Sequence, residues 1–121
     1  IQMPLNLEKV KENPRLLTGL VSGDLELVAQ EFRGDKKRLM MAAVFCHVRP
    51  THNLLGQLLG QHAPAVTRSL KVFLPRFVVA YEQAMGVTPM TQLTPVASMD
   101  ELRKRFPGVD DFLLIPEVTA A

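Results

Sequence analysis

The sequence is poor in cysteine and in long apolar runs, and each shortage excludes a class of protein. Cys46 is the one cysteine among 121 residues, which excludes an internal disulfide and fits a reducing compartment. We interpret it as a small buried hydrophobe. The longest fully apolar run, Leu39 to Cys46, is far shorter than the roughly twenty residues of a membrane span. No signal-peptide pattern precedes it, so we expect an intracellular protein, in the cytoplasm or nucleoid, or in the nucleus of a eukaryote.

Residues 36 to 81 contain no Asp or Glu, and this absence argues against catalysis and metal binding. All three histidines, His47, His52 and His62, fall in that stretch, without a cysteine pair or carboxylate nearby to complete a tetrahedral zinc site. No acid is present to orient a histidine as a base, so a Ser-His-Asp arrangement is not supported. The glycines there lack the Lys-Ser/Thr ending of a phosphate-binding loop. We therefore expect no enzyme activity, no cofactor and no small-molecule substrate.

The same stretch is basic, although the net charge of the chain is only +2. Its cations are Lys36, Lys37, Arg38, Arg49, Arg68, Lys71 and Arg76. A basic middle between acidic ends is expected when one segment faces a polyanion and the rest needs only to be soluble. The alternative is a chance run of basic surface on an ordinary helical domain.

Length and periodicity predict an all-α fold. A chain of 121 residues that is 47% hydrophobic suits one domain that buries about two-thirds of its unfolded surface. Residues 39 to 48 are apolar nearly all round, as expected of a buried central helix. Good N-cap residues, with a hydroxyl or a carboxylate side chain, precede the expected helices. They are Ser22, Asp35, Thr51 and Ser98. The predicted stops are Pro14, Gly34, Pro50, Gly86 and the pair Pro107 and Gly108.

Residues Arg49 to Pro75 contain the pattern of a helix-turn-helix. The two helices of this motif cross closely, so it needs a small residue on the first helix, a glycine at the turn and an apolar anchor on the second. Gly56, Gly60 and Val66 occupy these places. The predicted inward faces consist of Leu55, Leu58 and Leu59 on the first helix and Val66, Leu70, Phe73 and Phe77 on the second. We therefore predict a small helical bundle with a helix-turn-helix at about residues 51–74.

The prolines divide the remainder of the chain. Pro64 suits the first turn of a helix, whereas Pro75 inside a continuous helix would clash with the carbonyl of Lys71. We expect a break or kink there and a separate helix from about residue 76 to 85. Residues 88–97 have the composition of a linker. A short helix follows, and then a short strand-like segment, Phe112 to Ile115, with no partner strand in the chain.

The charge pattern and the predicted motif together favour DNA as the partner. A recognition helix from about Ala63 to Leu74 would lie in the major groove with its first residues near base edges. The candidates for base or nearby phosphate contacts are Gln61, His62, Thr67 and Arg68. The candidates for phosphate neutralisation, which sets affinity and salt dependence, are Lys71, Arg49, Arg76, Lys36, Lys37 and Arg38. A solvated helix start is an equal alternative for the cluster at residues 36–38.

Three segments, in order, resemble the N-terminal region of the insertion-sequence DDE transposases that share a helix-turn-helix with Harbinger-type elements. Leu17-Thr18-Gly19-Leu20, followed by an acidic helix ending at Phe32, resembles the opening LTGL segment of that family. Residues 44–75 are similar to its apolar helix, Pro-Thr turn, LLG, second glycine and closing leucine-proline. Residues 98–115 are similar to its short helix and the acidic lead into the catalytic domain. The likeness covers nearly the whole chain, in motifs that are individually weak.

The resemblance implies transposon-end recognition, and this sequence departs from the family in two places. Pro116 follows the segment after which the family has its first catalytic Asp, and the sequence stops at Ala121 before an RNase H-like domain. Two-metal strand cleavage needs several carboxylates on one rigid fold. Gln61-His62-Ala63 also replaces the usual Ser or Asp cap. We therefore expect a DNA-binding fragment, a stand-alone binder or a repressor of transposition, with a DNA-binding domain at 1–87, a linker at 88–97 and a lead toward an absent catalytic domain at 98–121.

The sequence also bears on protein partners, either a second copy of the chain or another protein. The resemblance implies a homodimer, because transposition pairs two element ends. The alternative to DNA binding is an all-helical protein-interaction or dimerisation module, whose adaptable surface would consist of methionines; these are Met40, Met41, Met85, Met90 and Met99. DNA binding should weaken steeply with salt, whereas an apolar interface should be nearly insensitive to it.

Overall fold

The computed structural model describes residues 5–91 and 94–114, and over these residues the chain is helical with no sheet. The helices are α1 Leu7–Glu12, α2 Arg15–Thr18, α3 Ser22–Phe32, α4 Lys36–Val48, α5 His52–Leu59, α6 Ala63–Met85, α7 Met99–Arg105 and the 3-10 helix η1 Val109–Phe112. The predicted all-α bundle is confirmed.

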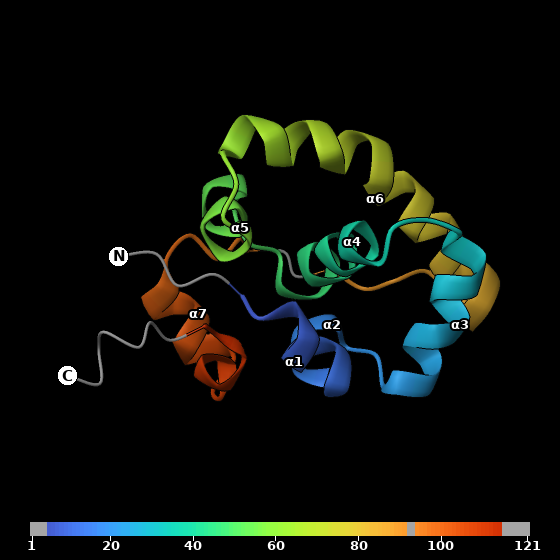
Figure 1. Cartoon of the computed structure of the whole chain (residues 1–121), viewed down its shortest axis with the longest axis horizontal. Helices are drawn as coiled ribbons and strands as arrows, with labels where there is room; N and C mark the ends of the chain where they lie inside the picture. Colours follow the sequence, from blue (N-terminus) through green and yellow to red (C-terminus); the bar gives the residue numbers. More distant parts are fainter. Residues whose placement is uncertain (1–4, 92–93, 115–121) are drawn as a thin grey trace.

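Helix α4 is the centre of the bundle, as its uniformly apolar composition predicts. Figure 1 shows α6 along the top of the molecule with α4 beneath it, α5 under one end and α3 at the other. Helices α3, α4 and α5 all pack against α6, and α2 packs against α4. The buried residues of α4 are Leu39, Met40, Met41, Ala42, Ala43, Val44, Phe45, Cys46 and Val48. Met40 and Met41 are therefore core residues and do not contribute to a methionine surface.

Three of the predicted N-caps are confirmed by side-chain hydrogen bonds. Asp35 Oδ1 accepts from the amide of Lys37 at 2.9 Å. Thr51 Oγ1 accepts from Leu54, and Ser98 Oγ accepts from Glu101, each at 3.2 Å. Each such cap stabilises its helix by about 1 kcal/mol. Local sequence thus determines where α4, α5 and α7 begin.

The predicted caps of α3 are each wrong by one residue. Val21 is the N-cap, and Ser22 is already helical. The helix ends at Phe32, and Arg33 rather than Gly34 takes the left-handed conformation, at φ 55°. Position 34 needs a glycine for a steric reason and not for its backbone conformation, because a Cβ there would lie 2.8 Å from the ring of Phe32. The single turn α2 was not predicted; Gly19, at φ 73°, ends it.

The predicted break at Pro75 is wrong, because α6 continues through it for 23 residues from Ala63 to Met85. Pro75 is exposed, so its missing amide hydrogen and its ring lie on the solvent side. Helices curve with their convex face toward solvent, which lengthens or opens hydrogen bonds on that face. Figure 1 shows α6 as one long ribbon that curves over the molecule. The curvature accommodates Pro75 without ending the helix.

The segment before α7 is tied to the start of α5. Val96 is fully buried and forms an isolated parallel bridge with Pro50. The amide of Thr51 donates to the carbonyl of Val96, and the amide of Val96 donates to that of Arg49, each at 2.9 Å. The division of the chain into domains at residues 88–97 stays a prediction.

The predicted C-terminal strand is wrong over its described part. Phe112 belongs to η1, and only Leu113 pairs, through an isolated antiparallel bridge with Leu5. Gly108, at φ 99°, turns the chain at the start of η1. Val109, Phe112 and Leu113 are buried in the core, so the segment turns back instead of extending. Arg103 Nε donates to Oδ1 of Asp110 at 3.0 Å in this arrangement. Ile115 lies outside the described residues.

Candidate nucleic-acid interface

Helices α5 and α6 are joined by a three-residue connection that depends on two glycines. Gly60 has the left-handed conformation, at φ 67°, and is the C-cap of α5. The amide of Gln61 then donates to the carbonyl of Gly56 at 2.8 Å. A Cβ at position 56 would lie 2.5 Å from the carbonyl oxygen of Gln61, a backbone atom with little freedom to move. Both glycines are therefore needed, as the sequence predicts.

The inner faces of this helix pair join the common core. Leu55 and Val66 are fully buried, and Leu58 and Leu70 are nearly so. Leu59 and Phe73 are partly buried. Figure 1 shows α5 nearly end-on beneath α6, so the two helices cross steeply. The predicted apolar anchor at Val66 is confirmed.

Thr67, a predicted DNA contact, is directed inward. Its Oγ1 lies 2.7 Å from Nδ1 of His52 and 3.0 Å from the carbonyl oxygen of Ala63. His52 also packs edge-on against the ring of Phe45, with centroids 5.8 Å apart. The hydroxyl of Thr67 thus links α5 to α6, and sequence reasoning overlooked His52 as its partner.

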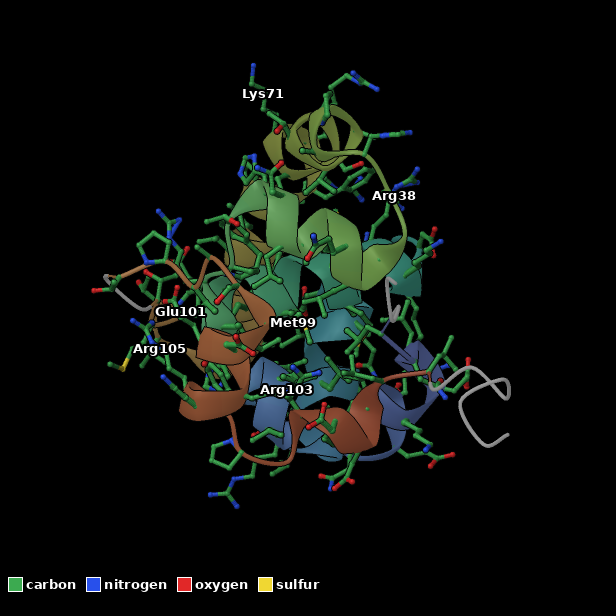
Figure 2. The ribbon with its side chains drawn as sticks, turned by 90° about the vertical axis from the view of Figure 1, so that its left-hand side faces the viewer. Arg38, Lys71, Met99, Glu101, Arg103 and Arg105 are labelled. Carbon is green, nitrogen blue, oxygen red and sulfur yellow. The ribbon has the colours of Figure 1, made fainter. Side chains whose placement is uncertain are left out.

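Arg68 and Lys71 lie on the outer face of α6, and both are exposed. Neither forms an ion pair with any of residues 5–91 or 94–114. Figure 2 shows Lys71 projecting from α6 away from the body of the molecule. His62 is exposed at the N-cap of this helix, and its side chain makes no capping hydrogen bond. Within residues 5–91 and 94–114, the amides of Ala63 and Ala65 in the first turn of α6 have no hydrogen-bond acceptor.

The cluster at residues 36–38 is divided between paired and unpaired cations. Lys36 Nζ lies 3.0 Å from Glu26, and Arg38 lies 3.9 Å from Asp35 and 4.9 Å from the centroid of Phe73. Lys37 is exposed and has no ion-pair partner among the described residues. Lys37 and Arg38 line a cavity of about 180 Å³ with Asp35, Met41, Leu59, Gln61 and Ser69. This cavity brings part of the cluster together with Gln61, another predicted contact.

Arg76 and Arg49 stabilise the fold through aromatic rings. Arg76 donates to the carbonyl of Phe32 at 3.2 Å, and its guanidinium lies 5.1 Å from the ring of Phe32 and 5.4 Å from that of Phe73. Arg49, at φ 57°, lies 5.3 Å from the ring of Phe45. Cation–π contacts of this kind hold side chains in place. The spacings Phe73–Arg76 and Phe45–Arg49 on one helix were the sequence signal that could have revealed these roles.

A second cavity, of about 580 Å³, lies on another part of the surface around His47; its lining consists of Asn13, Arg15, Leu16, Gly19, His47 and Phe106. The His47 ring packs edge-on against Phe106, with centroids 5.7 Å apart. Burial lowers the pKa of His47 below its ordinary value. Burial also raises the pKa of the neighbouring Cys46 to about 11, partly offset by Arg49. Both groups are therefore mainly uncharged at neutral pH.

Across 5–91 and 94–114, no group of three or more His, Cys, Asp or Glu side chains is arranged to hold a metal ion. No helix among these residues has the length and apolar character needed to cross a membrane.

No family model, no curated protein and no solved structure matches this chain. The likeness to transposases therefore rests on the sequence motifs alone.

Proposed function

We propose that this chain binds double-stranded DNA through the N-terminal half of α6, without cutting it. The observation that carries the proposal is that α5 and the N-terminal half of α6 contain no carboxylate, while their exposed cations, Arg68 and Lys71, have no ion-pair partner among the described residues. Residues 36–81 contain no Asp or Glu, so no neighbour in sequence neutralises this face. A polyanion is the partner that such a surface attracts.

The start of α6 is suited to phosphate. The positive end of the helix dipole and the uncapped amides of Ala63 and Ala65 point toward the same end of the helix as His62. Arg68 is one and a half turns further along the helix and can reach either a phosphate or a guanine edge. Lys71 and Lys37 would then neutralise flanking phosphates, while Arg76 and Arg49 add charge from fixed positions without direct contact.

The resemblance to transposases gives this proposal a finer form, in which the DNA is the end of a mobile element and binding is sequence-specific. A helix in the major groove that reads bases with Arg68, Gln61 and His62 would provide that specificity. The homodimer that the resemblance implies would pair two such ends, and it would have to form through a surface other than the DNA-binding face of α6.

A salt series with matched variants tests DNA binding. The affinity of the parent chain for a mixed-sequence duplex should fall steeply as salt rises, because phosphate contacts release counterions. Arg68→Gln and Lys71→Gln should each make the slope of log affinity against log salt shallower by about one. The control is Lys104→Gln, which removes an exposed charge from α7. Absence of binding at low salt, or equal effects of all three variants, would contradict the proposal.

The alternative, an interaction or dimerisation module, is favoured by a different observation. Val72 and Val79 are 55% and 52% exposed on α6, and Met90 is 88% exposed beyond its end. Exposed apolar side chains in line on one helix are typical of an interface.

A further inference from the structure

The outer face of α6 has a regular pattern that DNA binding does not explain. Exposed residues recur there at alternating steps of four and three, which is the spacing of a seam between two helices; they are Arg68, Val72, Pro75, Val79 and Glu82. Figure 1 shows no other helix above α6. The seam is apolar in its middle, basic at one end and acidic at the other.

We propose that this seam binds α6 of a second copy of the chain, antiparallel, across a two-fold axis at Pro75. Arg68 and Glu82 are each seven residues from Pro75, so the axis sets Arg68 of one copy opposite Glu82 of the other, twice. Val72 and Val79 lie three and four residues from the axis and meet each other at its two sides. The seam is thus self-complementary, as an isologous interface requires.

Charge determines the direction of the pairing. In a parallel pair Arg68 would face Arg68 and Glu82 would face Glu82, and like charges across an interface disfavour association. Neither side chain is committed to an opposite charge among residues 5–91 and 94–114. Glu82 Oε2 accepts one hydrogen bond from Thr88 at 2.9 Å, which steadies the carboxylate and leaves Oε1 for the partner.

The curvature of α6 limits the size of the contact. The helix is convex outward (Figure 1), so two copies meet around Pro75 and diverge toward their ends. One helix against one helix gives a smaller contact than the roughly 1,200–2,000 Å² of a stable interface. The dimer should therefore be weak, with a dissociation constant of about 10 µM to 1 mM.

This inference does not rest on the DNA proposal, yet the two meet at Arg68. A second copy that covers Arg68 excludes DNA from the same face, so the two partners compete. If both proposals hold, adding duplex DNA converts the dimer to DNA-bound monomer.

Sedimentation equilibrium without DNA, over about 10 µM to 1 mM protein, tests the seam. The parent chain should associate, whereas Val79→Asp, with a carboxylate at an exposed apolar position, should be monomeric with unchanged helix content. Glu82→Arg should weaken association by about tenfold or more. The double variant Arg68→Glu with Glu82→Arg should restore it by exchanging the charges. The control Thr88→Val, which removes only the hydrogen bond to Glu82, should have a small effect.

The two proposals fail in different ways. The charge-exchanged double variant should keep self-association and lose DNA affinity, so the two kinds of binding are measured separately on the same protein. A parent chain that stays monomeric at the highest concentration would overturn the dimer. So would association that both Val79→Asp and Glu82→Arg leave unchanged, or a double variant that fails to recover it.

Discussion

His52 and Thr67 are joined by a hydrogen bond whose donor is determined by a second bond. Thr67 Oγ1 lies 2.7 Å from Nδ1 of His52 and donates to the carbonyl of Ala63 at 3.0 Å. A hydroxyl can donate only one hydrogen bond, and that of Thr67 is donated to the Ala63 carbonyl. Nδ1 of His52 is therefore the donor in the bond between His52 and Thr67. Nδ1 of His52 therefore carries a proton in this arrangement. This bond joins the start of α5 to the first turns of α6.

Thr67→Val should destabilise the fold by about 1–2 kcal/mol, because it leaves the Nδ1 proton of His52 without an acceptor. Thr67→Ser keeps the hydroxyl and should cost less. Chemical unfolding of both variants gives the free energies. A Thr67→Val variant as stable as the parent, with a loss only in Thr67→Ser, would mean that the methyl group of Thr67, and not its hydroxyl, is what matters.

Gly56→Ala should destabilise the protein by about 1–3 kcal/mol, because its Cβ would lie 2.5 Å from the backbone oxygen of Gln61. The matched control is Gly23→Ala in α3, where a Cβ meets nothing within 4 Å. That change should stabilise by about 0.5–1 kcal/mol through the lower entropy of the unfolded chain. Thermal unfolding compares them, and a Gly56→Ala variant as stable as the parent would show that the α5–α6 connection is not tightly packed.

Acidification should destabilise the fold partly through His47. Burial holds the pKa of His47 in the folded state below its ordinary value, which is about 6.5. Its contribution is thus fully present above that pH and is lost as pH falls through the unfolded pKa toward the folded one. Between about pH 7 and about pH 5, the free energy of unfolding of His47→Gln should decline less than that of the parent. His62→Gln, at an exposed site, is the control and should follow the parent.

Cys46 should be unreactive in the native protein. Burial raises the pKa of its thiol to about 11, so the thiolate that attacks an electrophile is scarce at neutral pH. A thiol-specific reagent at about pH 8 should label Cys46 slowly in buffer and rapidly in denaturant. Fast labelling of the folded protein would contradict its buried position.

The sequence predicted the fold best where the signal is local. The caps Asp35, Thr51 and Ser98 and the turn glycine Gly60 act within a few residues, and all are confirmed. The apolar composition of α4 was sufficient to place it at the centre. Val66 was identified as buried from the helical spacing of apolar residues, whereas the helix-turn-helix itself stays a prediction.

Predictions were wrong where distant residues decide the outcome. Pro75 ends an isolated helix, yet here it lies on the convex face of a helix held by packing beneath it. The C-terminal segment forms a 3-10 turn whose Val109, Phe112 and Leu113 are buried in the core. In the candidate interface, Thr67 and Arg76 contact His52 and Phe32, which the sequence did not predict, and their role toward DNA stays a prediction. Such engagement depends on contacts 15 and 44 residues apart in sequence, which periodicity does not reveal.

The most direct test of the central claim maps the DNA contact residue by residue. In an NMR titration of isotope-labelled protein with a short duplex, kept dilute enough to be monomeric, the account predicts amide shifts concentrated at residues 61–72 and 36–38. Amides of α7, whose Arg103 and Arg105 lie away from Lys71 (Figure 2), should stay unchanged. Shifts centred on α7 or around His47, or no shifts under low-salt conditions, would contradict DNA binding through α6.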